Sequence, residues 1–227
     1  MLLGRLASFL DVRFGPAPAD DVATVWRHAT VPIRTLALAL DYGPHLAGFQ
    51  GDALLLHRPW KIGVDDLPGA GILAVHRRFD AQLTTGWNLP LAASLDLRQP
   101  EPLIVAGQTV GMVAQLDEPV MWQRWIERVG AVCDGIEDSR RHGVAAIETV
   151  AIASVMRADV MALLAANGVQ AFVTGQMRVP GLAPAERLGI GIVAVGHRRS
   201  ERWGLCRLAF ELTQVFPGLD VRLLERP

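Results

Sequence analysis

Three short apolar runs in this chain each end in a histidine that is followed directly by an arginine: His57-Arg58, His76-Arg77 and His197-Arg198. Two of these histidines also have a carboxylate four residues further on, Asp80 after His76 and Glu201 after His197. Imidazoles and carboxylates delivered by strand ends to one edge of a sheet are typical ligands of zinc, iron, manganese or cobalt. Because the chain has only six histidines, this placement predicts a metal site.

The pair His197 and Glu201 has the spacing of two residues on one face of a helix, about one turn apart, so both side chains can point at one ion. That geometry requires a helix that starts at the corner formed by Gly196 and continues through Arg207 toward Val215. The strand end at His57 would complete the site where two parts of the chain face each other, and we expect the site at such a domain junction. The alternative for each histidine is a hydrogen-bonded structural role.

The elements that must position these residues are predicted from apolar runs and helix punctuation. Strands are expected at residues 36–41, 53–57, 72–76, 150–154, 171–174 and 190–195. Helices are expected at residues 158–167 and 184–188, with Pro184 in a first turn, and as amphipathic segments near the start of the chain and over 118–130. Near-continuous apolar strands that alternate with helices indicate an α/β fold.

The order of these elements also suggests an internal duplication. In both parts of the chain the last strand runs into a His-Arg-Arg triplet with an acidic residue at the same offset. We therefore predict two similar α/β halves, residues 1–98 and 99–227, joined by a proline-containing linker at 98–102.

Composition narrows the class of protein. The chain has 227 residues, of which 51% are hydrophobic and 20% charged, and its formal net charge is −1. This balance lacks the excess of positive charge that is typical of proteins that bind nucleic acid or an anionic membrane. No apolar run approaches the roughly 20 residues that span a bilayer, and Cys133 and Cys206 form no CxxC pattern. We expect a cytoplasmic protein without nucleic-acid or membrane partners.

Several motifs together resemble the Nif-three-like family, whose members are also described as dinuclear-metal-centre hexameric proteins and GTP cyclohydrolase I type II homologues. The resemblance covers nearly the whole chain. The sequence Leu56-His57-Arg58-Pro59 is similar to the family's His-His-Pro, and the segment 76–80 followed by Gly86-Trp87-Asn88 is similar to His-Thr-Asn-Leu-Asp with Gly-Xaa-Asn. Thr174-Gly175-Gln176 resembles Thr-Gly-Glu, and the segment 196–201 matches Gly-His-Xaa-Xaa-Xaa-Glu.

The resemblance implies four metal ligands at a site between two similar α/β halves: His57, Asp80, His197 and Glu201. His76 would lie beside the site, where it and Glu201 are candidate proton shuttles in catalysis. Arg58 replaces the second histidine of the family motif, and a guanidinium has no lone pair to donate to a metal. We therefore expect one divalent ion per chain (zinc, iron or manganese) or none.

The arginines beside the candidate ligands suggest a second chemistry. Arg58, Arg77 and Arg198 could clamp an anion such as phosphate, because a guanidinium binds such groups with two parallel hydrogen bonds. The alternative is that they are ordinary surface residues, since Lys61 is the only lysine and arginine supplies almost all the positive charge.

Two functions follow from this set. The first is a metal-dependent hydrolase, similar to a GTP cyclohydrolase or a phosphoesterase, that acts on a phosphate-containing or nucleotide substrate. The second is a non-catalytic metal-handling or regulatory scaffold with a degenerate metal site. In both cases the resemblance implies a homo-oligomer, namely a hexamer.

Overall fold

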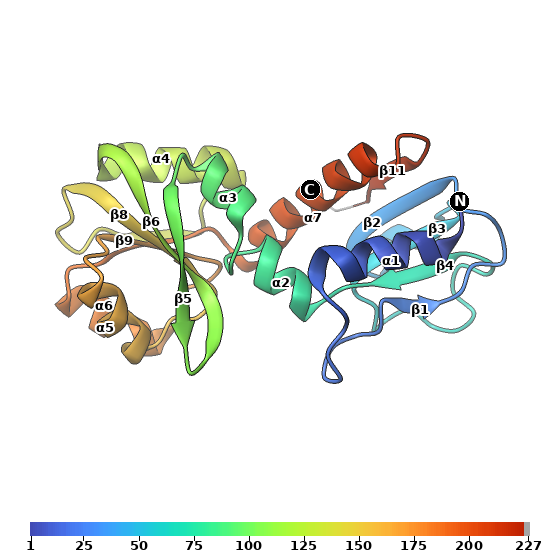
Figure 1. Cartoon of the computed structure of the whole chain (residues 1–227), viewed down its shortest axis with the longest axis horizontal. Coiled ribbons are helices and arrows are strands. Elements are labelled where there is room, and N and C mark those ends of the chain that lie inside the picture. The colour runs from blue at the N-terminus through green and yellow to red at the C-terminus, as the bar shows by residue number, and fades with distance from the viewer. Residues whose placement is uncertain (225–227) are drawn as a thin grey trace. The chain divides into compact units, whose positions relative to one another are not determined.

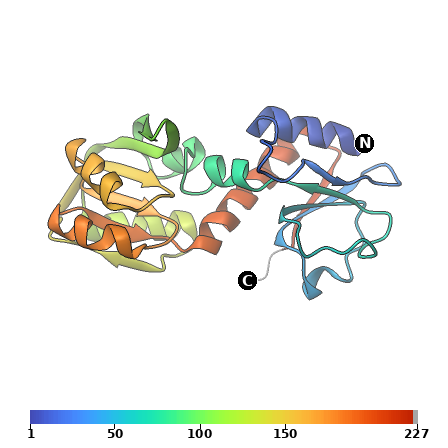
Figure 2. The same ribbon diagram turned by 90° about the horizontal axis from the view of Figure 1, so that it is seen from below.

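The computed structural model describes residues 1–224. They form two compact α/β units, each built around its own sheet (Figures 1 and 2). The first unit contains Met1–Phe79 and the chain from Gly204 onward, and the second contains Asp80–Trp203. These units differ from the predicted halves 1–98 and 99–227, because the chain returns to the first sheet near its end. The last strand, β11 (Asp220–Leu223), pairs in parallel with β2 (Thr35–Asp41).

The first unit has a five-stranded sheet in the order β1-β4-β3-β2-β11. Strands β2, β3 (Ala53–Arg58), β4 (Gly71–Ala74) and β11 are parallel, and β1 (Val25–Arg27) is antiparallel to β4. The middle strands are buried along nearly their whole length, as expected for parallel strands covered on both faces. Helix α1 (Leu3–Phe14) packs on this sheet, since a Cβ on Gly71 of β4 would lie 2.8 Å from Leu3 (Figure 2). The short helix η1 (Pro44–Leu46) follows β2.

The second unit has a six-stranded sheet in the order β5-β6-β8-β9-β10-β7. Its strands are β5 (Arg98–Val105), β6 (Gln108–Met121), β7 (Asp138–Arg140), β8 (Ala146–Ala153), β9 (Ala171–Thr174) and β10 (Gly191–Ala194). Strands β8, β9 and β10 are parallel, and the others pair in the antiparallel direction.

Helices cover both faces of this second sheet (Figure 1). One face packs against α3 (Leu89–Ser94) and α4 (Trp122–Cys133), with Trp125 buried in that core. The other face packs against α5 (Ala158–Ala166) and α6 (Val179–Arg187). Helix α2 (Arg77–Leu83) begins in the first unit and ends in the second, and α7 (His197–Val215) begins in the second and ends in the first. None of the helices in residues 1–224 is long and apolar enough to cross a membrane.

Three local predictions were wrong, and each has a physical reason. The expected linker at 98–102 is the start of β5, an edge strand, where the prolines cost few ladder hydrogen bonds. Pro184 lies inside α6, because that helix begins five residues earlier, at Val179, with Pro180 in its first turn. The helix predicted over 118–130 begins only at Trp122, since residues up to Met121 continue β6.

Candidate metal site

His57 and His76 come from the carboxyl ends of two neighbouring parallel strands. His57 is the last residue but one of β3, and His76 follows the end of β4 by two residues, with Leu56 of β3 in register with Ala74 of β4. The parallel pairing therefore delivers both imidazoles to the same edge of the first sheet. Helix α2 starts directly after His76 and has Asp80 in its first turn.

The three side chains form one compact group. A ligand atom of each of His57, His76 and Asp80 lies within 4.8 Å of the others. The two imidazole rings have centroids 4.8 Å apart and are tilted by 43°. His57 is fully buried, with the ring of Phe79 5.0 Å away. Trp60, which is 57% exposed, meets His76 edge to face at 4.9 Å.

This donor set fits a single transition-metal ion. Two imidazoles and one carboxylate suit zinc, iron or manganese, whereas calcium and magnesium favour oxygen ligands alone. Ligand atoms bound at about 2.1 Å from one ion are at most about 4 Å apart, so the observed spacing needs only a small adjustment. The group can thus supply three ligands to one ion.

His197 and Glu201 form a second pair, in the second unit. Helix α7 begins at His197, after Gly196 with a φ of +95°, and it places the two side chains one turn apart as predicted. The His197 Nε2 lies 3.0 Å from Glu201 Oε1. The Glu201 side chain is 1% exposed and that of His197 57% exposed. A buried carboxylate thus fixes the orientation of an imidazole that solvent can reach.

The loop after β9 packs beside this pair. The backbone N–H of Gly175 donates to Thr85 Oγ1 at 3.2 Å. A Cβ at Gly175 would lie 3.3 Å from Ser200 Oγ and 3.9 Å from the Cα of His197. The motif Thr174-Gly175-Gln176 therefore packs tightly beside the first turn of α7.

The predicted site residues thus occur in two groups. His57 and Asp80 lie together, and His76, which the family resemblance placed beside the site, belongs to the same cluster. His197 and Glu201 lie together on α7. The roles of these residues as ligands or proton shuttles stay predictions.

Arg58 is engaged elsewhere. Successive side chains of a strand point to opposite faces, so Arg58 leaves β3 on the face opposite to that of His57. Its Nε donates to Asp41 Oδ1 at 2.7 Å and its Nη2 to Asp41 Oδ2 at 3.0 Å. Asp41 ends β2, directly in register with Arg58. Arg77 similarly forms an ion pair with Asp20. Carboxylates therefore balance two of the arginines that were predicted to bind an anion, and the anion-binding role of Arg58, Arg77 and Arg198 stays a prediction.

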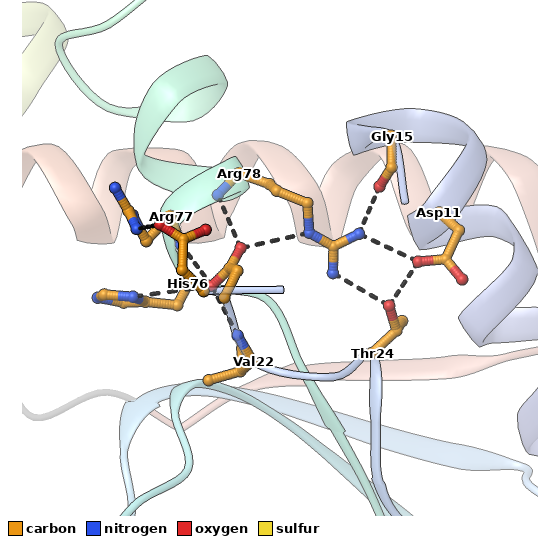
Figure 3. A network of polar contacts seen from close by, with 9 residues as sticks. Asp11, Gly15, Val22, Thr24, His76, Arg77 and Arg78 are labelled. Atoms are coloured by element: carbon orange, nitrogen blue, oxygen red, sulfur yellow. Dashed lines mark hydrogen bonds and ion pairs between the residues drawn. The ribbon is translucent and has the colours of Figure 1, made fainter. Parts of the chain in front are cut away.

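One residue at this edge of the sheet was not expected from the sequence. Asp21 has a fully buried side chain, and its carboxylate accepts hydrogen bonds from the backbone amides of Val22, Arg77 and Arg78 (Figure 3). Burial raises the pKa of the Asp21 carboxyl, but these hydrogen bonds and the charge of Arg78 outweigh burial, so the pKa lies below the ordinary 3.8. Asp20-Asp21 reads as a polar loop in the sequence, which contains no signal for these contacts.

Comparisons with known proteins agree with this architecture. Relatives named GTP cyclohydrolase 1 type 2 homolog occur in Allochromatium vinosum and Haemophilus influenzae. The first is 28% identical over 193 residues, covering 78% of this chain and 74% of the relative, and the second is 26% identical over 192 residues, covering 76% and 74%.

Solved structures show the same fold. Protein ybgI, described as of unknown function, superposes with a TM-score of 0.79 at 19% identity, covering 100% of this chain and 99% of the other. TTHA1606 from Thermus thermophilus superposes with a TM-score of 0.75 at 22% identity, with the same coverage. Residues 69–226 match the family model Duf34/NIF3 (NGG1p interacting factor 3), and because this match spans most of the chain, the protein belongs to that family.

Proposed function

We propose that this protein binds one divalent metal ion per chain through His57, His76 and Asp80, and that it uses the ion to hydrolyse a phosphate-containing or nucleotide substrate. The observation that carries the proposal is the cluster itself, in which ligand atoms of three side chains lie within 4.8 Å of one another. A bound divalent ion supplies Lewis-acid polarisation and lowers the pKa of a water molecule toward neutrality.

Two aromatic residues lie beside the cluster and would have different roles. Phe79 is buried beside His57 and keeps bulk water away from that ring. Trp60 offers an exposed indole next to His76, and such a surface suits the planar ring of a nucleobase. The relatives' name, GTP cyclohydrolase 1 type 2 homolog, makes GTP the first nucleotide to test.

Within this proposal Glu201 keeps the proton-transfer role that was predicted from the sequence. His76 has its ring within the ligand cluster, and an imidazole that donates its lone pair to a metal no longer accepts a proton at that nitrogen. The carboxylate of Glu201 lies 3.0 Å from His197 Nε2, so this pair can hold a proton between its two side chains. A hexameric assembly accompanies the proposal as an expectation from the family resemblance, and a cytoplasmic location as an expectation from the sequence composition.

The second candidate function is a metal-handling scaffold without turnover. It is favoured by Arg58, which stands where the family pattern has a ligand histidine and is bound to Asp41 through two hydrogen bonds. A chain that has lost a ligand in this way can keep metal affinity after losing the chemistry of a two-ion centre.

Elemental analysis of the protein loaded with zinc, manganese or iron tests the binding step. We expect one ion per chain, its loss in His57→Ala, and its retention in the matched control His45→Ala, because His45 is an exposed residue of η1. Two ions per chain would contradict the single-ion site, and no ion with any metal would contradict metal binding altogether.

Turnover separates the two functions. The loaded protein is incubated with GTP and other nucleotides, and with a generic phosphoester. Activity that Glu201→Gln abolishes and Glu186→Gln leaves intact supports the hydrolase, since Glu186 is an exposed residue of α6 in the same unit. One bound ion without turnover on any of these substrates supports the scaffold.

A further inference from the structure

We propose that Asp21 is a positioning residue for His76: its carboxylate keeps the imidazole in the tautomer that carries hydrogen on Nδ1, which leaves Nε2 as the metal-binding atom. The inference rests on the proposed metal site and adds a residue that lies outside the segment matched by the family model, residues 69–226.

The geometry of Asp21 relative to His76 is the first step. The His76 Nδ1 lies 3.9 Å from Asp21 Oδ1. Trp60 also packs against the His76 ring, edge to face at a centroid distance of 4.9 Å. At 3.9 Å the Nδ1 and Oδ1 atoms form no hydrogen bond. A buried carboxylate charge that faces one ring nitrogen nevertheless favours the tautomer with hydrogen on that nitrogen, because the opposite tautomer would turn a lone pair toward the negative charge. Asp21 is placed to do this for His76.

Asp21 itself is rigidly held. Its Oδ1 accepts from the amides of Val22 at 2.8 Å and Arg77 at 3.1 Å, and its Oδ2 accepts from the amide of Arg78 at 3.2 Å. The Arg78 Nε lies 3.4 Å from Oδ2. With both oxygens occupied, the carboxylate has little freedom to rotate. Its position relative to His76 is therefore set by the backbone of the first turn of α2.

Arg78 ties this arrangement to the N-terminal segment. Its side chain is 5% exposed, and the guanidinium donates to Asp11 Oδ1 at 3.1 Å, to Thr24 Oγ1 at 3.0 Å and to the carbonyl of Gly15 (Figure 3). The segment that carries Asp21 is thus clamped on both sides to the helix that carries Asp80. One carboxylate then orients two members of the cluster, His76 by facing its ring and Asp80 by fixing the start of its helix.

The tautomer is measured directly in the metal-free protein. Long-range ¹H–¹⁵N spectra at about pH 8, above the ordinary histidine pKa of about 6.5, distinguish hydrogen on Nδ1 from hydrogen on Nε2, and a His76→Gln variant assigns the signals. We expect the Nδ1–H form in the wild type and a mixture, or the Nε2–H form, in Asp21→Asn. Predominance of the Nε2–H form in the wild type would overturn the inference, and this test needs no variant of Asp21 to fold.

Zinc affinity, measured by competition with a chromophoric chelator, provides the second readout. Loss of the group that faces the other ring nitrogen of a ligand histidine lowers metal affinity about 10–100-fold. We expect that decrease in zinc affinity in Asp21→Asn. The matched control is Asp52→Asn, since Asp52 also accepts two backbone amides in the first unit, from Arg34 at 2.8 Å and Thr35 at 2.9 Å. The control should leave both the His76 tautomer and the zinc affinity unchanged.

The outcomes separate this inference from the proposed function. A wild type with the Nδ1–H tautomer that binds no zinc contradicts the metal site and leaves the positioning role standing. Zinc affinity and tautomer both unchanged in a folded Asp21→Asn variant refute the positioning role and leave the metal site standing. An equal loss of affinity in Asp52→Asn also refutes it, because the effect would then be a general consequence of lower stability.

Discussion

Replacing Arg58 with alanine should lower the free energy of unfolding by about 1–3 kcal/mol. The guanidinium and the Asp41 carboxylate are joined by two hydrogen bonds, and their side chains are 19% and 20% exposed. Exposed ion pairs contribute about 0.2–1 kcal/mol, whereas breaking a fully buried pair costs about 3–5 kcal/mol because a charge is left without compensation. A pair that is about four-fifths buried falls between these limits.

Urea unfolding of a double-mutant cycle measures this coupling. Arg58→Ala and Asp41→Ala remove the same pair, so the double variant should lose less stability than the two single variants added together. Arg58→Lys should lose an intermediate amount, because an ammonium keeps the charge but cannot donate in the same forked geometry. The control is Arg98→Ala, whose partner Asp117 is 66% exposed, and its effect should stay within about 0.5 kcal/mol.

Ligand binding supplies the refuting result. If the Arg58 guanidinium is available to a phosphate, Arg58→Ala will weaken phosphate or nucleotide binding and change stability by less than about 0.5 kcal/mol. Purely additive effects of the two single substitutions would also contradict a coupled pair. Weakened phosphate binding with little loss of stability would return Arg58 to the anion-binding role predicted from the sequence. Either result would contradict the account of Arg58 as the partner of Asp41.

Two further predictions concern packing and pH. Gly86→Ala should destabilise the second unit by about 1–3 kcal/mol, because the new Cβ would lie 2.3 Å from the carbonyl oxygen of Ala81. The control is Gly130→Ala on helix α4, where nothing lies within 4 Å of the new Cβ. Thermal melts of this control should show a small gain in stability. The second prediction concerns Asp52→Asn. Between pH 7 and pH 3 the free energy of unfolding, measured by urea titration, should fall less steeply in this variant than in the wild type. The amides of residues 34–35 hold the pKa of Asp52 below 3.8 despite the opposing effect of burial, so its contribution is present above 3.8 and lost as the pH falls through the lower folded value. An unchanged pH slope in the variant would contradict this account.

The parts of the fold that follow from local patterns could be predicted from the sequence. Continuous apolar runs located β2, β3, β9 and β10, because parallel strands buried on both faces leave no polar alternation to obscure them. The start of α7 at His197 was predicted from the Gly196 corner and from the four-residue spacing to Glu201. These signals act over short stretches of neighbouring residues, so no knowledge of distant contacts is needed.

Long-range features could not be predicted in this way. The pairing of β11 with β2 joins residues 185 positions apart, such as Asp220 and Thr35, and it changes the division into units without changing any local pattern. Asp21 reaches the amide of Arg77 across 56 positions, and a capping signal is recognisable in a sequence only when the cap directly precedes its helix. The missed strand β5 has a related cause, since its prolines are tolerated only because it lies at the edge of the sheet.

The repeated His-Arg pairs also show how one sequence pattern acquires different meanings. Within β3 the pair must split across the two faces of the sheet, so His57 lies with His76 and Asp80 while Arg58 turns to Asp41 on the neighbouring strand. After β4 the pair spans the end of a strand and the start of a helix, where the amide of Arg77 bonds Asp21 and its guanidinium bonds Asp20. The arginine therefore follows the histidine for different structural reasons in these two places. Because Asp41 holds Arg58 on the opposite face of the sheet, the guanidinium adds no positive charge to the cluster of His57, His76 and Asp80.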